Sequence, residues 1–560
     1  MAQAQAAEPA EPAGTFAPLG VAVFRRFWFA NVASNFGSLI QAVGAAWLMT
    51  LIASSDTQVA LVQASTTLPV MMLSLVTGAM ADRYDRRRLM LWSTLFMLSV
   101  SVALTVCAYL DLLSAWGLLG FTFLIGCGFA VHNPAWQASV RDFVGMRMLP
   151  QAVLLNGMGF NVTRSVAPAL GGIVVATLGA AVAFAINAAS YLGLLFAIFR
   201  WSGSEGDERR DLQPEGLRAA IRAGVRYAGS SPHLLRLYSR GFAFGAGAIA
   251  LLALLPLVAR DQLGGDSLTF GLLLGAFGLG AVGGGLVSNA LRKRLTSEQM
   301  VRLAFIVLVF VLLLVSLSRW LLLSMPIVAL GGGAWVLALA FFNTSVQLST
   351  PRWVVGRALS LYQMTTFGGM ALGSWVWGLW VTHYSLPIAL QIAAGALLIG
   401  LSLGFRWPLT DRTALNLDPL DRWREPDVAL DIVPRSGPIA LAIEYLIDPD
   451  DVPEFMAAMQ ERQRIRRRDG ARMWKLYRDL ERTELWIERF ELPTWADYVR
   501  FHSRTTQEDG EVLDRARALH RGEARPRVRR MLVRDPGDTR FGRPGETPDL
   551  GALALTDRSP

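Results

Sequence analysis

The sequence predicts an all-α polytopic membrane protein of twelve transmembrane helices in two six-helix repeats, followed by a soluble α+β domain. Two observations carry this prediction. From about residue 24 to 407 the chain is a series of apolar stretches of roughly 18–25 residues, the length at which a helix crosses ~30 Å of hydrocarbon. From 408 to 560 the sequence is charged and has few long apolar runs. Over all 560 residues, 53% are hydrophobic.

Twelve spans are predicted from the apolar runs. The first six are 25–53, 57–80, 88–110, 115–138, 151–178 and 180–200, and the second six are 238–260, 267–290, 299–318, 320–348, 357–382 and 385–406. Arginine-rich connections alternate with connections that hold only Arg260 and Arg319. The positive-inside rule therefore places both termini in the cytoplasm. In this scheme the arginines from Arg209 to Arg240 are counted with the central cytoplasmic loop, although the seventh predicted span begins at 238.

The remaining segments complete the predicted domain organisation. Two six-helix bundles cover 21–200 and 238–407, separated by a central cytoplasmic loop over 201–237. Residues 1–20 and 536–560 are predicted to be disordered tails, and 408–437 a linker. The net charge of +9 does not indicate nucleic-acid binding, because much of the excess lies in short loops between spans. Cys107 and Cys127 lie in apolar runs, so a disulfide scaffold is not expected.

One charged motif interrupts the apolar runs after the second span. It reads GAMADRYDRRR, with Gly78 four residues before Asp82 and with Arg83, Arg86 and Arg87 after it. A fainter copy follows the eighth span, at Gly285, Asn289, Arg292 and Lys293. The segment from Arg147 to Gly159 also aligns loosely with Arg357 to Gly369. Two parallel copies indicate a duplicated six-helix unit.

These features resemble the major facilitator superfamily over residues 20–407. Its loop signature reads Gly-x-Leu-x-Asp-Arg-x-Gly-Arg-Arg/Lys; Met80 here replaces the leucine and Asp85 the second glycine. The branch that the chain looks most like holds the enterobactin exporter and macrolide efflux proteins. The resemblance implies that Asp82 faces the start of helix 11 near Gly356 and latches the cytoplasmic side. The alternative, an ordinary solvated loop, accounts for the arginines alone.

The fifth span holds a second element that resembles the superfamily. Arg164, Ala167, Pro168, Gly171 and Gly172 are similar to the Gly-Pro-x-x-Gly-Gly element of antiporter and export branches, with Ala167 at its first glycine. Small residues around a proline favour a kinked, closely packed helix. A generic proline kink is the alternative.

Few polar residues interrupt the spans, and these are the candidates for substrate binding or coupling. Arg164 is favoured, because a mid-span arginine needs a partner or a water-filled cavity. Relatives carry an acid after a helix 1 glycine where this chain has Ser38, so the usual proton-coupling carboxylate is absent. Proton-coupled antiport stays open as an alternative, with Asp142 or His132 as the titrating group. Six tryptophans are candidates for lining a substrate cavity, although positions at the membrane–water interface or facing lipid are favoured for most of them. These are Trp47, Trp136, Trp335, Trp375, Trp377 and Trp380. The other candidates are Asn31, Asn35, Gln41, His132, Asp142, Asn343, Gln347 and Gln363.

The segment 438–535 is predicted to fold as a ferredoxin-like domain with βαββαβ order. Strands are expected at 439–447, 471–478, 483–491 and 527–533. The pattern resembles the dimeric α/β barrels of antibiotic biosynthesis monooxygenases, which implies a homodimer through this domain. A membrane-tethered monooxygenase is the rival function, with Trp474, Trp486, Trp495 and His502 lining a pocket. Core packing of these aromatic residues is the alternative, and it makes the domain a dimerisation or regulatory module.

The sequence as a whole predicts a transporter and not an enzyme. We expect export of a small amphipathic molecule, a drug or a siderophore-like metabolite, across a bacterial inner membrane by alternating access. The expected partners are this substrate and the lipid bilayer. No cofactor or metal is expected, because no metal-ligand spacing, catalytic triad or phosphate-binding loop is present.

Overall fold

The computed structural model describes Gly14 and residues 16–201, 217–351, 353–409, 416–420 and 422–534. It divides into two compact units. The first comprises Met1–Arg210, His233–Gln347 and Gly356–Asp411, and the second Asp211–Pro232, Leu348–Val355 and Arg412–Pro560. The predicted tails lie mostly outside the described residues. Part of the N-terminal tail is an exception, because Ala17–Gly20 form a 3₁₀ helix (η1), so this part is not disordered.

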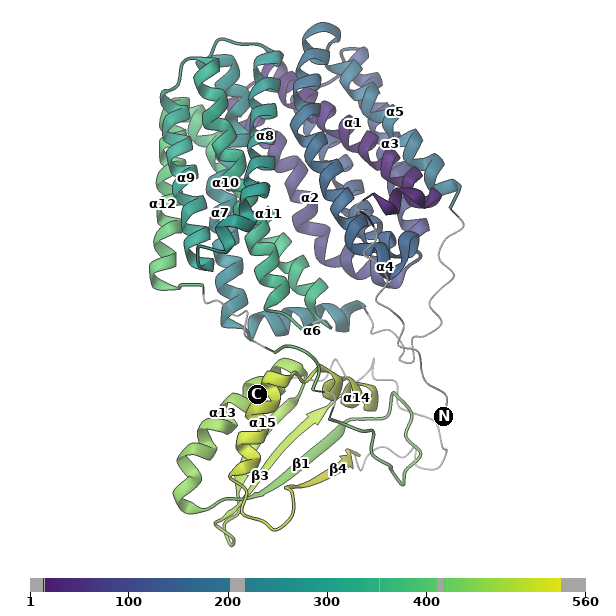
Figure 1. Cartoon of the computed structure of the whole chain (residues 1–560), viewed down its shortest axis with the longest axis vertical. Coiled ribbons are helices and arrows are strands. Elements are labelled where there is room, and N and C mark those ends of the chain that lie inside the picture. Colours follow the sequence, from purple (N-terminus) through teal and green to yellow (C-terminus); the bar gives the residue numbers. More distant parts are fainter. Residues whose placement is uncertain are drawn as a thin grey trace. The chain divides into compact units, whose positions relative to one another are not determined.

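The first unit is built of long helices (Figure 1). Eleven helices in the described residues are long and apolar enough to cross a membrane. The first unit has one further long helix, α11 (Val355–His383), which lies where the eleventh span was predicted. It is not among the helices that meet the length and apolarity needed to cross a membrane. The helices are α1 (Ala22–Ile52), α2 (Asp56–Arg83), α3 (Arg86–Tyr109), α4 (Ala115–Leu178), α5 (Ala180–Phe199), α7 (Pro232–Leu257), α8 (Ser267–Arg292), α9 (Ser297–Leu317), α10 (Leu321–Leu348), α11 and α12 (Leu386–Arg406), with a π-helical turn η2 at Val258–Gln262.

Helix α4 contains two of the spans, Ala115–Gly145 and Arg147–Leu178. Gly145, with φ of 69° and ψ of 174°, separates them. A positive φ of this kind is available to glycine at little cost because it has no Cβ. The predicted loop at 139–150 is therefore wrong, since a one-residue break takes its place and Arg141 and Arg147 are helical.

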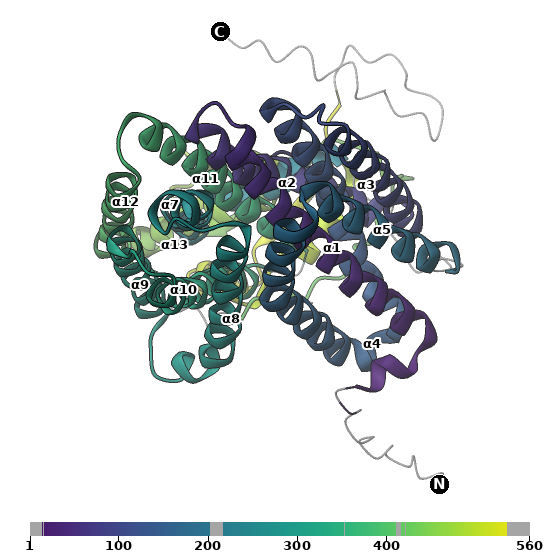
Figure 2. The same cartoon turned by 90° about the horizontal axis from the view of Figure 1, so that it is seen from above.

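The helices form two groups that lie side by side when seen from above (Figure 2). The first group is α1–α5, in which α1 and α3 both pack against α4 and α5. The second group is α7–α12, in which α9 packs against α12. The two groups meet along α8 and the second part of α4, where Gly271 approaches Gly172 and Gly278 approaches Arg164.

Arg240 lies inside the second group and not in a loop, which corrects the sequence prediction. Helix α7 begins at Pro232, and the Arg240 side chain is only 1% exposed. Its Nη1 lies 3.3 Å from Oε1 of Glu298 at the start of α9. Glu298 also binds Arg302 Nε at 2.9 Å and the backbone N–H of Leu409 at 3.0 Å. Arg240 is buried because an ion pair compensates its charge.

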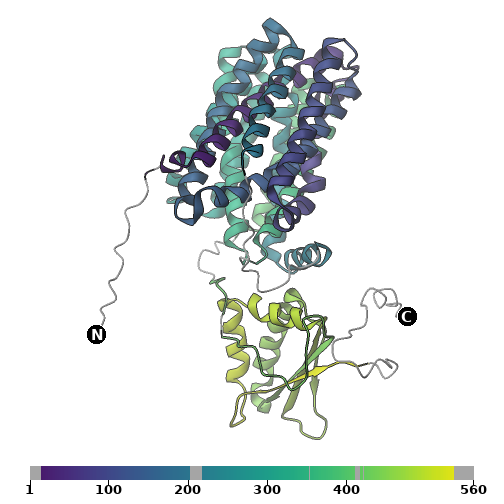
Figure 3. The same ribbon diagram turned by 90° about the vertical axis from the view of Figure 1, so that its right-hand side faces the viewer.

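The second unit contains helix α6 (Leu217–Gly229), the segment 348–355 and the C-terminal domain. The domain has the order β1 (Ile439–Leu446), α13 (Val452–Asp469), β2 (Arg472–Arg478), β3 (Leu485–Leu492), α14 (Trp495–Arg504), α15 (Gln507–Ala518) and β4 (Arg527–Leu532). Its antiparallel sheet has the strand order β2-β3-β1-β4. Helices α13–α15 cover one face of the sheet (Figure 3).

The side chains on the helix-covered face of the sheet form the core of the domain. Leu441 on β1 stands opposite Phe490 on β3 and Arg530 on β4. Phe455 from α13 and Tyr498 from α14 pack onto this face in the same cluster. Thr494 and Thr506 cap α14 and α15, so two helices stand where the βαββαβ order predicted one.

Candidate functional site

A cavity of about 450 Å³ lies between the two groups of helices in the first unit. Side chains from α1, α2, α4, α5, α7, α8 and α11 line it. Most of its wall is apolar, with Phe129, Phe160, Phe277 and Phe367 among the larger side chains. Hydroxyl and amide groups interrupt this wall, including Ser38, Gln41, Gln63, Asn133 and Gln363. A volume and a lining of this kind suit a small amphipathic molecule.

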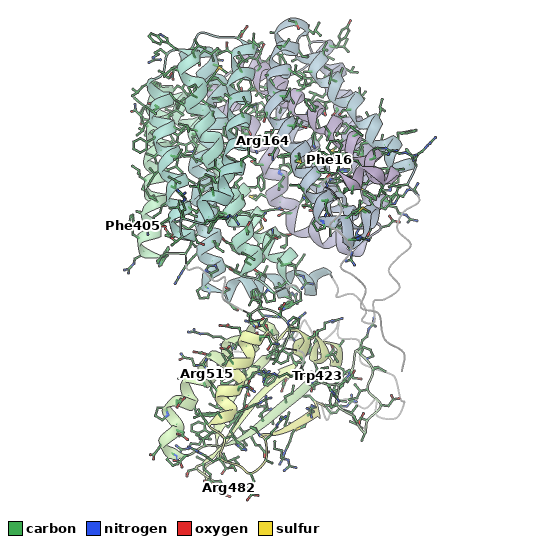
Figure 4. The ribbon with its side chains drawn as sticks, in the orientation of Figure 1. Phe16, Arg164, Phe405, Trp423, Arg482 and Arg515 are labelled. Atoms are coloured by element: carbon green, nitrogen blue, oxygen red, sulfur yellow. The ribbon has the colours of Figure 1, made fainter. Side chains whose placement is uncertain are left out.

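Arg164 is the only formally charged residue among those that line this cavity. It extends from the second part of α4, and Figure 4 shows it between the two groups of helices. Its guanidinium carbon lies 5.2 Å from the centroid of the Phe277 ring on α8. The ring face offers the cation partial compensation for lost hydration. Arg164 therefore joins the two groups of helices at the cavity and provides it with one positive charge.

The helix 5 element holds this part of α4 tightly against its neighbours. A Cβ on Gly172 would lie 2.8 Å from the Ser267 carbonyl oxygen and 3.0 Å from Gly271 Cα. A Cβ on Gly171 would lie 3.1 Å from Ile40 Cα. Small residues thus let α4 approach both α1 and α8 closely. Ala167 is buried and Pro168 lines the cavity, so the element positions Arg164, one turn away, against α8.

The candidate residues Gln41, Arg164 and Gln363 meet at this cavity, and the other candidates do not line it. His132 is buried and its Nδ1 lies 3.3 Å from Thr94 Oγ1. Asp142 lies on α4 and pairs with Arg86 at 2.8 Å. Asn343 and Gln347 bind each other. Asn31 and Asn35 are half-buried on α1. None of the six tryptophans weighed for the wall lines it.

Asn187 on α5 is a polar residue behind the cavity that the sequence analysis missed. Its amide nitrogen donates to Gln41 Oε1, and its Oδ1 accepts from Ser38 Oγ at 3.3 Å. Its side chain is fully buried. These bonds fix two of the polar groups that face the cavity. Asn187 sits in an apolar run, and this is the signal that could have revealed it.

The α2–α3 end of the first unit, where Tyr84 and Asp85 separate these helices, carries the charged motif. A Cβ on Gly78 would lie 2.9 Å from Ser360 Oγ on α11, and Ser74 Oγ donates to the Ser360 carbonyl at 3.2 Å. Arg86 and Arg87 donate to backbone carbonyls at Ala138 and Ile198. The side chains of Asp82, Arg83 and Asn289 are outside those that the structure describes, so the latch stays a prediction.

Among the described side chains, the second copy of the motif shows fewer contacts between helices. Arg292 Nη2 donates to Thr344 Oγ1 on α10 at 3.3 Å, and Lys293 caps the C-terminus of α8. A Cβ on Gly285 would meet no atom of the described residues within 4 Å. Close packing therefore accompanies Gly78 and not Gly285.

The α1–α2 end, where residues 53–55 separate these helices, carries a link that the sequence analysis missed. Arg260 Nη2 lies 3.2 Å from Asp56 Oδ1, and its Nη1 donates to the Thr50 carbonyl at 2.7 Å. Nearby, the hydroxyls of Thr57 and Thr382 are 2.8 Å apart. Each contact joins one group of helices to the other. The sequence singles out Arg260, because it is one of only two arginines in the connections that alternate with the arginine-rich ones. It does not identify Asp56 as the partner of Arg260.

The four aromatic residues proposed for a monooxygenase pocket do not meet in one site. Trp486 and Trp495 belong to the hydrophobic core of the C-terminal domain. Trp474 donates to Glu488, while His502 stacks on Trp423 with ring centroids 4.8 Å apart. Among the described residues, no group of three or more His, Cys, Asp or Glu side chains could hold a metal ion.

Comparisons with known proteins identify the family. Residues 13–536 match the family described as transmembrane secretion effector. The macrolide efflux protein A of Streptococcus pyogenes is 25% identical over 232 residues, which is 38% of this chain and 56% of the relative. The multidrug efflux pump Tap of Mycolicibacterium fortuitum is 28% identical over 222 residues, 37% and 53% of the two chains. The staphyloferrin A transporter of Staphylococcus aureus is 27% identical over 156 residues, 28% and 39%.

These matches span between about two fifths and just over half of the relatives' own length. Among solved structures, the nucleoside transporter NupG superposes with a TM-score of 0.55 at 10% identity, covering 69% of this chain and 98% of NupG. A bacterial homologue of the lysosomal transporter Spinster superposes with a TM-score of 0.56 at 15% identity, covering 70% and 98%. The fold of the first unit is that of these transporters, and the chain belongs to the transmembrane secretion effector family of major facilitator superfamily transporters.

Proposed function

We propose that this protein exports a small amphipathic molecule across a bacterial inner membrane by alternating access. The observation that carries the proposal is the cavity between the two groups of helices, with an apolar wall and one charge at Arg164. Names of relatives support export: they include macrolide efflux, multidrug efflux and siderophore transport proteins. The proposal includes α11 as a twelfth span, two six-helix repeats and cytoplasmic termini.

Transport in inverted membrane vesicles tests this function. We expect the vesicles to accumulate at least one of erythromycin, Hoechst 33342 and staphyloferrin A, and Arg164→Gln to reduce that uptake at least tenfold. The matched control is Arg141→Gln, which removes an arginine at an exposed position of the same helix. Uptake of none of these compounds would count against the exporter. Repeating the assay with and without a pH gradient decides proton coupling separately.

The two ends of the bundle are proposed as its gates. At the α1–α2 end, the Arg260–Asp56 pair and the Thr57–Thr382 bond hold the groups together. At the α2–α3 end, Asp82 would act against the start of α11, and the close approach of Gly78 to Ser360 supports this. An Asp82→Asn variant that inserts normally and transports at the wild-type rate would remove the latch.

The C-terminal domain is proposed to be ferredoxin-like and to act as a dimerisation or regulatory module. The βαββαβ order and the sheet order β2-β3-β1-β4 support the fold, with α14 and α15 together in the place of the second helix. A homodimer through this domain predicts a doubled mass by light scattering of the detergent-solubilised chain. Scattering at the monomer mass over the accessible concentration range would reject it.

A further inference from the structure

A cavity of about 660 Å³ lies within the C-terminal domain and shares no lining residue with the cavity of the first unit. Its floor is the helix-covered face of the sheet, where Leu441 and Ile443 of β1 and Val528 of β4 face inward. Helices α13, α14 and α15 and the segment around Trp423 form its walls. The volume falls in the range of sites that hold one small organic molecule.

The wall of this cavity is strongly basic. Six arginines line it, whereas Asp514 is the only carboxylate among the lining residues. Asp514 is already engaged with Arg422 at 2.8 Å. Burial lowers the pKa of His502 to about 4, so this ring is neutral near pH 7. The positive charge that faces the cavity therefore belongs to the guanidinium groups.

A buried triad gives this charge a fixed position. Arg462 Nε binds Glu488 Oε2 at 2.8 Å, and Arg466 Nε lies 3.3 Å from Oε1 of the same carboxylate. Burial favours the protonated form of Glu488, but the two guanidinium groups outweigh it and keep the Glu488 pKa below its usual range. Two buried cations share one anion, which leaves one positive charge without a counter-charge in the triad.

Two donors on the same wall lack a hydrogen-bond partner among the residues that the structure describes. Nη1 of Arg462 has none, although the Arg462 side chain is only 3% exposed. Nε1 of Trp423 also has none, and its ring stacks on His502 to form a flat aromatic surface. Burial raises the Tyr445 pKa to about 12, so its hydroxyl remains protonated there. A buried donor without a partner is costly, and an acceptor group on a ligand would relieve that cost.

We propose that this cavity is a binding site for a small aromatic carboxylate. The carboxylate oxygens would accept from Arg462 and from Arg530, which lies on β4 at the same wall. The aromatic ring would lie on the Trp423–His502 surface and over the apolar floor. Charge-assisted hydrogen bonds to arginine supply the preference for the anion, and the stacked rings supply the preference for an aromatic body. This site does not depend on the transport function.

Isothermal titration calorimetry on the full chain in lipid nanodiscs tests the site, with 1-naphthoate as the probe and neutral 1-naphthalenemethanol as its matched analogue. We expect naphthoate to bind at one site per chain and the alcohol at least tenfold more weakly. Arg530→Gln and Trp423→Leu should each weaken naphthoate binding at least tenfold. Arg462→Gln should abolish it, and the Arg530 variant decides the question if Arg462→Gln does not fold.

Two control variants separate this site from other sites. Arg482 is exposed at the β2–β3 turn, and Figure 4 labels it far from Trp423 in the same domain, so Arg482→Gln should bind naphthoate normally. Arg164→Gln should also bind it normally. Absence of binding, equal binding of the alcohol, or loss in Arg164→Gln with retention in Arg530→Gln would overturn the proposal. Measuring naphthoate transport in vesicles then shows whether the bound ligand is itself transported or only regulates the protein. Either role requires binding at this site.

Discussion

Glu298 illustrates how one side chain holds several elements together. Its carboxylate binds Arg240 of α7, Arg302 one turn along α9 and the backbone after α12. Removing one partner of a buried ion pair leaves an uncompensated charge, at a cost of about 3–5 kcal/mol. We therefore expect Glu298→Gln to lower the thermal unfolding midpoint of the detergent-solubilised protein by several degrees.

A matched variant is available in the same cluster. Arg302 is about one third exposed, and the pair that it makes is of the i,i+4 kind. Such a pair contributes at most about 1 kcal/mol. Arg302→Gln should therefore shift the unfolding midpoint much less than Glu298→Gln. Equal shifts for the two variants would contradict the assignment of Arg240 as a buried charge that depends on Glu298.

We expect His502 to make the stability of the C-terminal domain depend on pH. Its pKa is about 4 in the folded domain because of burial, against about 6.5 in an unfolded chain. The unfolded state therefore takes up a proton as pH falls below 6.5, and the folded state does so only near pH 4. The free energy of unfolding should consequently fall, by about 2 kcal/mol between pH 7.5 and pH 5.

Hydrogen–deuterium exchange of α14 and β1, corrected for intrinsic rates, measures this change. The His502→Gln variant should lose about 2 kcal/mol of the pH dependence that the wild type shows over this range. An identical dependence in both proteins would assign it to other groups.

At the scale of single residues, the sequence predicted which polar residues matter but did not predict the residues that they pair with. Arg164 and Gln41 stand out as polar residues in apolar runs, and both line the cavity. Arg240 was placed in a loop because an arginine near the end of an apolar run ordinarily marks one. Its compensating carboxylate lies 58 positions along the chain. Such pairings depend on packing, which no local pattern reveals.

At the scale of elements, the α1–α2 end of the bundle offers a test of gating. Arg260 and Asp56 are each about one third exposed, so the pair contributes roughly 0.2–1 kcal/mol. We expect Asp56→Asn to raise the fraction of molecules open at this end by about 1.4- to 5-fold. The rate at which a membrane-impermeant maleimide modifies a cysteine placed at Ser38, on the cavity wall, reports this opening.

A charge exchange supplies the control for this pair. The double variant with Asp56→Arg and Arg260→Asp restores the attraction and should return the labelling rate toward that of the wild type. Equal labelling of the wild type and Asp56→Asn would show that the pair does not hold this end closed.

Most long helices were predictable because a run of apolar side chains is the main requirement for a span. The strands of the C-terminal domain were also predictable, from alternation and from the turn residues between them. The break at Gly145 was not, because a single glycine with a positive φ separates the two spans where a loop was expected. The split between α14 and α15 depends on the Thr506 cap, a local signal that the sequence analysis did not use.

At the scale of the whole chain, three distant segments form the second unit. Tyr227 of α6 packs edge-on against Trp353, with ring centroids 5.7 Å apart. Arg504 of α14 lies over Trp353 at 4.4 Å, and Arg468 of α13 lies over Tyr227 at 5.3 Å. Arg226 Nε also donates to the Arg468 carbonyl at 3.1 Å. The C-terminal domain is thereby attached to both α6 and the segment 348–355.

Removing the shared aromatic residue tests this attachment. We expect Trp353→Ala to raise hydrogen–deuterium exchange at least several-fold in α6 and in the last turns of α13 and α14, because cation–π contacts and ring packing are lost together. Trp320→Ala, at an exposed position of the first unit, is the control and should leave these amides unchanged. Unchanged exchange in Trp353→Ala would show that the segments are held by other contacts.

The last turns of helix α13 contact both the cavity of the C-terminal domain and the aromatic pair of Tyr227 and Trp353. Arg462 and Arg466 face the cavity, and Arg468 faces Tyr227. Helix α14 does likewise, with His502 at the cavity and Arg504 on Trp353. Residues 230 and 231 alone separate α6 from α7, and the segment 348–355 connects α10 to α11. A ligand that stiffens α13 and α14 would thus also restrain α6 and the segment 348–355. These two segments are continuous in the chain with α7, α10 and α11 of the second group.

The composition of the second unit also governs how the protein can be dissected and recombined. A stop codon or a fusion joint within residues 408–437 removes the sheet and α13–α15, yet it leaves Tyr227 and Trp353 behind without the arginines that cover them. Such a truncate exposes two aromatic rings to water, and a chimera with a foreign tail inherits the same defect. A chimera that exchanges the C-terminal domain between two proteins must therefore exchange three segments of the chain: α6, the segment 348–355 and the C-terminal domain itself.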